Sequence, residues 1–252
     1  MKVFRFNFDS ITHLKKMLRM KNVLALVLFS LLVFNTSTSF AQMVTEEPGS
    51  INYLTNKAIT INANERNFSG SAYENKEFAK GYVFKSGKTL ASNIALRYNA
   101  KRDEIEVKSS LSSSNESARV LVKHDDIYIK ILNKVFVYSP VKEGIEKAGY
   151  FMVIHEGTNY SLYKKLTKKF IEGREAVNSI TRDTPPSFRN KEVYYLVNKS
   201  NGSFTVFPKS KKGKLKVFSN NKKEIKSFVK SNRLNVNRDY DLAKLVKYFD
   251  TL

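Results

Sequence analysis

The chain of 252 residues contains no cysteine at all. This absence excludes disulfide bonds, thiolate zinc sites, iron–sulfur clusters, a cysteine nucleophile and a lipid-modified N-terminal cysteine. Glycine and proline are also sparse, with ten and five residues, so the composition is neither collagen-like nor globally disordered. Because 42% of the residues are apolar, the chain can bury an ordinary hydrophobic core in one or two domains.

Negative charge is scarce as well, and the imbalance is concentrated near the C-terminus. Lys and Arg supply 44 residues against 23 Asp and Glu, a formal net charge of +21. Residues 191–252 hold fifteen basic and five acidic residues, whereas residues 42–190 hold 23 and 17. Clustered lysines attract phosphates and other anions over long range but select weakly among them.

Long apolar runs are missing except for one stretch of twelve residues, Val23–Phe34, which is too short to span a bilayer comfortably. Four basic residues stand directly before it, between positions 15 and 21, and a polar spacer then leads to Ser39-Phe40-Ala41. This arrangement predicts a secretory signal over residues 1–41 with an extended basic N-region, cleaved between Ala41 and Gln42. Translation from either Met1 or Met20 fits. We therefore expect an exported protein, periplasmic or secreted, with no membrane span after cleavage.

The chain after residue 41 divides into four regions that differ in composition and in the spacing of apolar residues. Residues 42–69 are a polar lead-in with one apolar island at 58–61, and residues 70–172 alternate short β-branched runs with turn residues. Residues 173–190 read as a linker or long connection, and residues 191–252 as a β-hairpin followed by a basic two-helix module.

Two segments carry specific structural expectations. In residues 104–108, Ile105 and Val107 alternate with charges, which predicts a half-buried strand with Glu104 and Glu106 on its solvated face. Residues 160–171 fit either helical or strand spacing, and we favour a strand because the polar turn at 156–159 precedes them.

Near the C-terminus the apolar period changes from two residues to 3.6. We expect Ser219 to cap one helix and Asn237 to cap a second. Their apolar stripes consist of Ile225, Phe228 and Val229 in the first helix, and Leu242, Leu245, Val246 and Phe249 in the second. The predicted fold class is therefore α+β: an antiparallel meander of about eight to ten strands, with two amphipathic C-terminal helices packed on it.

Three short stretches carry a family resemblance: Leu96-Arg97-Tyr98-Asn99, residues 103–107 (Asp-Glu-Ile-Glu-Val) and the ending at residues 241–249. Together with the signal segment, they resemble a group of uncharacterised exported, β-rich proteins of Bacteroidetes-type bacteria. That group has no established activity, so the resemblance implies a location in the cell envelope and no mechanism.

A search for catalytic chemistry finds no complete motif. His124 stands beside Asp125 and Asp126, but adjacent residues should point in different directions, and we interpret the group as a polar hairpin turn. Ser-x-x-Lys matches such as Ser161 to Lys164 and Ser227 to Lys230 lack the companion motifs of acyl-serine enzymes. We predict no catalytic, cofactor-binding or metal-ligating residue and no enzyme activity, although a carboxylate pair formed by folding stays open.

Charge is the remaining signal, and it suggests candidate anion-binding residues. They form two clusters, Lys164, Lys165, Lys168 and Lys169, and Lys209, Lys211, Lys212, Lys214 and Lys216. The leading hypothesis is a non-enzymatic envelope protein that binds an anionic surface or a protein partner through its lysine-rich C-terminal face. The anionic surface would consist of lipid headgroups, lipopolysaccharide or acidic polysaccharide. Export disfavours nucleic acid, and a solvated basic face with no single partner stays open.

A second hypothesis starts from the aromatic content. The chain has eighteen Phe and thirteen Tyr, many on short predicted strands. A curved sheet lined by such residues would suit a periplasmic carrier of an apolar or lipid ligand, although aromatic residues more often simply fill the core.

Overall fold

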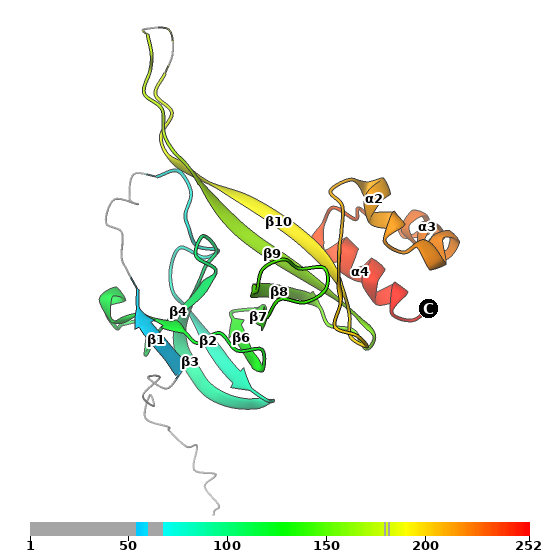
Figure 1. The fold of residues 1–252 in the computed structure, drawn as a ribbon, viewed down its shortest axis with the longest axis horizontal. Helices are drawn as coiled ribbons and strands as arrows, with labels where there is room; N and C mark the ends of the chain where they lie inside the picture. The colour runs from blue at the N-terminus through cyan, green and yellow to red at the C-terminus, as the bar shows by residue number, and fades with distance from the viewer. Residues whose placement is uncertain (1–53, 60–67, 179, 181) are drawn as a thin grey trace, which may run out of the picture. The chain divides into compact units, whose positions relative to one another are not determined.

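The computed structural model describes residues 54–59, 68–178, 180 and 182–252, which belong to one compact unit, Pro48–Leu252 (Figure 1). The predicted signal segment, its cleavage site at Ala41 and Gln42, and most of the lead-in lie outside the described residues. Within the described part of the chain, no helix combines the length and apolar character needed to cross a membrane.

Among the residues that the structure describes, eleven antiparallel strands form a single sheet, which confirms the predicted α+β class with a mainly antiparallel sheet. The strand order is β1-β5-β4-β3-β2-β6-β7-β8-β9-β10-β11, so most neighbours in the sheet are also neighbours in the sequence. The strands are β1 Thr55–Ala58, β2 Ala79–Lys85, β3 Lys88–Asn99, β4 Glu104–Lys108, β5 Arg119–Leu121, β6 Ile127–Ile131, β7 Lys134–Ser139, β8 Gly149–His155, β9 Tyr160–Ile171, β10 Ser187–Asn198 and β11 Phe204–Val206.

The turns fall where their residues predict them. Ser86 and Gly87 join β2 to β3 with positive φ angles of 48° and 78°, the backbone geometry of a tight hairpin turn. The ambiguous segment 160–171 is strand β9, and it pairs with both β8 and β10. Cross-strand pairing therefore decides the conformation where local spacing permits a helix as well.

The sheet curls around its main core. One buried cluster joins Ile105 of β4, Ile129 of β6, Phe136 of β7 and Leu166 of β9. The Tyr98 hydroxyl of β3 also donates to the Leu166 carbonyl at 3.2 Å, although β3 and β9 are five places apart in the strand order. A flat sheet would not bring these strands together, so its curvature encloses the core.

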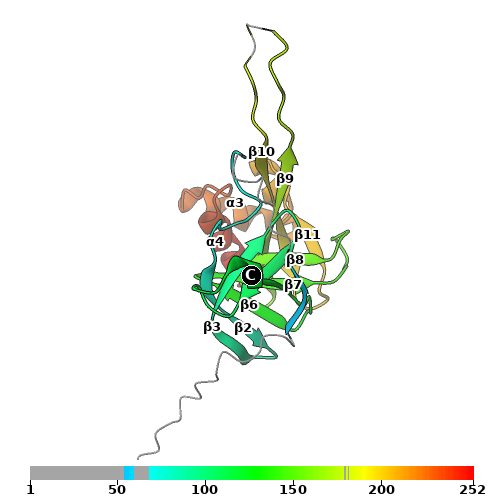
Figure 2. The same ribbon diagram turned by 90° about the vertical axis from the view of Figure 1, so that its left-hand side faces the viewer.

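Most of the predicted linker, residues 173–186, is the connection within one long hairpin, whereas its last four residues, 187–190, belong to β10. β9 and β10 pair residue by residue over twelve positions, and a bridge between Arg174 and Thr184 continues the pairing beyond them. This arm projects away from the other strands (Figures 1 and 2). Near its tip Val177 and Ile180 are 92% and 90% exposed.

Three α-helices follow β11, where the sequence predicts two. They are α2 Lys211–Lys216, α3 Lys222–Ser231 and α4 Asp239–Phe249; η3 Asn115–Ser117 and η4 Ser219–Asn221 are short 3₁₀ helices. The predicted caps are wrong by two residues for α3 and by one residue for α4. Ser219 lies in η4 and α3 is preceded by Asn221, while the Asn237 side chain accepts a hydrogen bond from Lys214 and Arg238 precedes α4.

The apolar stripes of α3 and α4 belong to one core cluster, in which α3 packs on α4 and α4 packs on the sheet. Ile225, Leu242, Leu245 and Val246 are buried with Leu162 of β9 in one cluster, and α4 contacts β8 and β9. This confirms that the predicted stripes are core positions.

Carboxylates hold both ends of α4 to the sheet. Asp239 accepts hydrogen bonds from Lys164, at 2.5 Å, and from the Tyr194 hydroxyl. Asp250 accepts the backbone N–H groups of residues 158, 159 and 160, at 2.7–2.8 Å, in the β8–β9 turn. Burial alone would raise the pKa of each carboxyl, but these hydrogen bonds outweigh it and hold both pKa values below the usual range.

The expectation for Glu104 and Glu106 is wrong, because β4 is buried on both faces. Glu106 is fully buried and accepts two hydrogen bonds from Arg97, at 2.6 and 3.1 Å, and one from Asn99 at 3.0 Å. The Arg97 guanidinium stacks on the Tyr73 and Phe78 rings, from the segment that covers this face. Glu104 pairs with Lys57 at 2.7 Å. The carboxylates are thus structural, each held by a cation.

Candidate functional site

The strongest concentration of charge lies on α2, η4 and α3. Residues 209–233 contain ten basic residues and one acidic residue, Glu224. Nine of the ten basic side chains are exposed, and we call them the basic helical face. They are Lys209, Lys211, Lys212, Lys216, Lys222, Lys223, Lys226, Lys230 and Arg233. Among the residues that the structure describes, no ion pair joins any of the nine to a carboxylate.

Lys214, the tenth basic residue, does not belong to this face. It is only 5% exposed, and its ammonium group donates to the Val236 carbonyl at 2.9 Å and to the Asn237 amide oxygen at 3.0 Å. Burial lowers its pKa, and the charge of Asp239 acts in the opposite direction. The chain turns back over α2 after α3, which converts a candidate surface lysine into an internal tie between α2 and the segment before α4.

In the first predicted cluster, on β9, two of the four lysines are also bound by other groups of the protein. Lys164 pairs with Asp239, and Lys165 donates to Asp103 at 2.7 Å and to the Tyr150 carbonyl at 2.9 Å. Burial lowers the pKa of Lys165, partly offset by Asp103. Lys168 is half-buried and Lys169 is exposed. Lys164 and Lys165 are half-buried, and each is paired with a carboxylate. They therefore do not contribute to an exposed anion-binding surface.

Helix α3 contributes cations that the candidate residues of the sequence analysis omit. Lys222, Lys226 and Lys230 are spaced by four residues, so they lie along one side of the helix. The predicted helix with its apolar stripe already contained this spacing, and following it would have placed the three lysines on one side of α3.

Two adjoining hollows lie between α2 and α3 on this face. The first, of about 350 Å³, is lined by Lys212, Leu215, Lys216, Ser219, Lys222 and Lys226. The second, of about 490 Å³, shares Leu215 and Lys226 with the first and adds Lys211, Val229, Lys230, Arg233 and Leu234. We call the two hollows together the α2–α3 groove. Its lining contains seven cationic side chains and no carboxylate, and most of the exposed lining surface is apolar.

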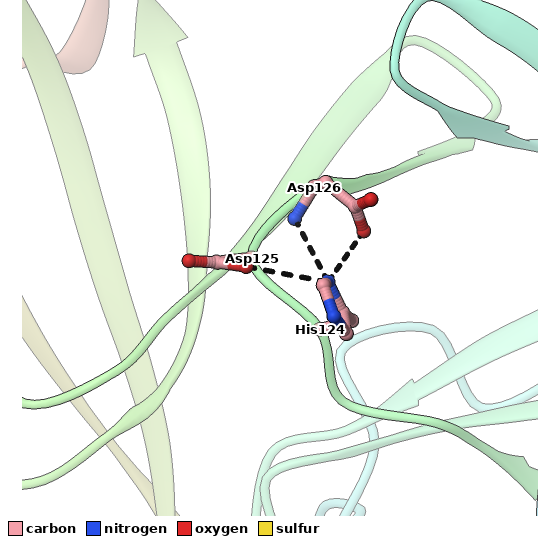
Figure 3. Close-up of side chains that lie close together, drawn as sticks. All are labelled: His124, Asp125 and Asp126. Carbon is pink, nitrogen blue, oxygen red and sulfur yellow. Dashed lines mark hydrogen bonds and ion pairs between the residues drawn. The ribbon is translucent and has the colours of Figure 1, made fainter.

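His124, Asp125 and Asp126 converge more closely than expected (Figure 3). Their candidate ligand atoms lie within 4.8 Å of one another, with His124 Nδ1 at 3.2 Å from Asp125 and 2.5 Å from Asp126. The expectation of divergent side chains is therefore wrong, because the turn before β6 folds back on itself. All three residues are consecutive and largely exposed, and Asp126 also accepts from Ser86 at 3.5 Å. These are the contacts of a polar turn.

The aromatic residues of the sheet pack on one another. The Tyr98 ring lies 5.0 Å from Phe136 and 6.3 Å from Tyr150, and all three are buried. Phe204, Phe207 and Phe218 are buried too, in the other two clusters. Core packing accounts for these rings, which leaves the basic helical face and its groove as the candidate site.

No family model, curated protein or solved structure matches this chain.

Proposed function

We propose that this protein is a non-enzymatic, exported protein of the cell envelope that binds an anionic lipid surface through its basic helical face. The observation that supports the proposal is a set of nine exposed cations, seven on α2 and α3 and two directly beside them, with a single carboxylate, Glu224, among them. The export step rests on the apolar run at Val23–Phe34 and the small residues before Gln42.

The physical basis is long-range attraction summed over many lysines. Each lysine close to an anionic membrane contributes about 1 kcal/mol to binding. The attraction extends about 8 Å at physiological ionic strength and about 3 Å at 1 M salt. Because α2 and α3 lie together at one end of the described unit (Figure 1), several of these side chains can approach one surface at the same time. Binding by this face should therefore be strong at low salt and weak at high salt.

The first experiment determines the N-terminus of the protein isolated from the cells that make it. The proposal predicts Gln42 as the first residue and recovery from the envelope fraction. An intact N-terminal segment on protein from the cytosol would overturn the export step.

The second experiment measures binding of that isolated form to phosphatidylglycerol and phosphatidylcholine vesicles over a range of salt concentrations. Replacing Lys212, Lys222 and Lys230 with Gln should weaken binding to phosphatidylglycerol at least tenfold. A matched control replaces three exposed sheet lysines, Lys80, Lys88 and Lys130, with Gln, which removes the same net charge. Equal losses in both triple variants, or binding that salt does not weaken, would contradict a role for this face.

A further inference from the structure

The α2–α3 groove combines two features that a purely electrostatic surface does not need. Its rim is cationic, and its floor is apolar, formed by Leu215, Val229 and Leu234. Leu215 is shared by both hollows, so the apolar floor continues from one to the other. A free phosphate would use only the rim, and a neutral apolar molecule would use only the floor.

We propose that this groove binds one molecule of an anionic amphiphile, with its alkyl or acyl chain on the apolar floor and its phosphate among the lysines of the rim. This inference rests on the proposed function, because it assigns a ligand class to the same face. It goes further in naming a single ligand chain that lies along the groove, in addition to contact with a lipid surface. Charge complementarity identifies the occupant, since the lining holds cations without a carboxylate.

The dimensions of the groove agree with this ligand class. Its two hollows, of about 350 and 490 Å³, are each in the range of small-molecule sites, roughly 300 to 1,000 Å³. Every methylene group that leaves water for such a floor should raise the affinity about fourfold. Chain length is therefore the variable that separates a groove ligand from a simple counter-ion.

The floor is fixed in place before any ligand arrives. Lys214 ties α2 to Val236 and Asn237, and the Ser210 hydroxyl accepts the Gly213 N–H at 3.1 Å at the start of the helix. On the other side, Val229 and Leu234 are buried in the cluster shared with α4. A preformed floor loses little conformational freedom when it binds a chain.

The test uses butyl, octyl and decyl phosphate, each below its micelle concentration, and inorganic phosphate. Calorimetry on the isolated protein should show affinity rising at least tenfold from butyl to decyl phosphate, with inorganic phosphate weakest. Methyl NMR signals of Leu215, Val229 and Leu234 should shift on binding, while signals of Val83 in the sheet core should not. Equal affinity for all chain lengths, or shifts confined to the sheet, would overturn the inference.

Two variants separate the groove from the surrounding charge. Ser219→Phe fills the first hollow from an exposed position without altering any cation, and it should weaken decyl phosphate binding at least tenfold. Lys226→Gln removes the lysine shared by both hollows and should weaken it about fivefold. Its matched control is Lys247→Gln, an exposed helical lysine of α4 that belongs neither to the basic helical face nor to the groove lining, and this variant should change the affinity less than twofold.

The failure of this inference is distinguishable from failure of the proposed function. Salt-sensitive vesicle binding without a chain-length effect supports surface binding and overturns the groove ligand. A chain-length effect that Ser219→Phe leaves intact places the chain elsewhere and also overturns it. Decyl phosphate binding in the groove without vesicle binding supports the groove and overturns the surface. If Ser219→Phe does not fold, the Lys226→Gln and Lys247→Gln pair and the chain-length series decide the question.

Discussion

In the sheet, several charged side chains are buried and paired, whereas on α2 and α3 nearly all are exposed and lie next to one another. Arg97 and Glu106 form an internal ion pair between β3 and β4, and Lys165 is held by Asp103. The lysines of the basic helical face have no such partner within the described part of the chain. The same residue type therefore serves the fold in one region and is left available to a ligand in the other.

The difference shows which charges stabilise the protein. A buried ion pair is costly to break, because the remaining partner keeps an uncompensated charge in a poorly solvated place. Like charges four residues apart on an exposed helix are slightly destabilising. The row Lys222, Lys226 and Lys230 thus weakens α3 a little, which favours a binding role over a stabilising one.

The largest expected effect comes from breaking the charge pair inside the sheet. Arg97→Met leaves Glu106 buried beside Asn99 alone, and we expect the free energy of unfolding to fall by about 3–5 kcal/mol in urea titrations. The control, Lys223→Gln on the basic helical face, should change it by less than about 0.5 kcal/mol. Similar small losses in both variants would show that the sheet does not depend on this pair.

The next effect tests the one buried lysine of the helical region. Lys214→Met leaves the Val236 carbonyl and the Asn237 amide oxygen without their donor, and should cost about 1–3 kcal/mol of stability. Lys212→Met, two residues earlier and exposed, is the matched control and should be nearly neutral. Thermal unfolding of the two variants measures the difference. Equal melting temperatures would contradict the internal role of Lys214.

A smaller effect is the expected loss of stability at low pH. Because the pKa values of Asp239 and Asp250 are lowered in the folded protein, their contribution to stability is complete above the ordinary aspartate pKa, about 3.9. It is lost as the pH falls through the lower folded values. Methyl NMR signals of Leu245 in α4 should broaden below about pH 4, before those of Ile129 in the sheet core. The variant carrying Asp239→Asn and Asp250→Asn should lack this step; simultaneous loss of both signals in the wild type would exclude it.

The smallest expected effect is a slight gain. Replacing Lys222, Lys226 and Lys230 with Gln removes two like-charge contacts at a spacing of four residues, worth about 0.2–0.5 kcal/mol each. The urea midpoint should stay the same or rise slightly while binding to phosphatidylglycerol vesicles falls. A clear loss of stability would mean that these lysines support the fold, and the contrast between the two regions would disappear.

Much of the fold follows from local patterns in the sequence. The turn at Ser86 and Gly87, the strands that it joins and the apolar stripes of α3 and α4 lie where periodicity predicts them. Helix starts were less well determined, because Asn237, which has a capping side chain, uses it to accept from Lys214. Helix α2 was not predicted, because six residues with four lysines and a glycine carry too little apolar periodicity.

The candidate site was predicted in part. The sequence placed Lys209, Lys211, Lys212 and Lys216 on a basic face, and the structure finds them exposed. The candidate residues also included Lys164, Lys165 and Lys214. In the structure these lysines pair with carboxylates and carbonyl groups of distant segments. Local sequence contains no information about such partners, since they come from segments up to 75 residues away.

The sequence by itself determined the excess of lysine near the C-terminus, the absence of thiol chemistry and an antiparallel sheet with amphipathic helices, because composition and periodicity are local properties. The tertiary structure decided which lysines are free to bind an anion and that an apolar groove lies between them. Both depend on how the chain returns over α2 and β9, and charge partners and hollows form only when distant segments pack together.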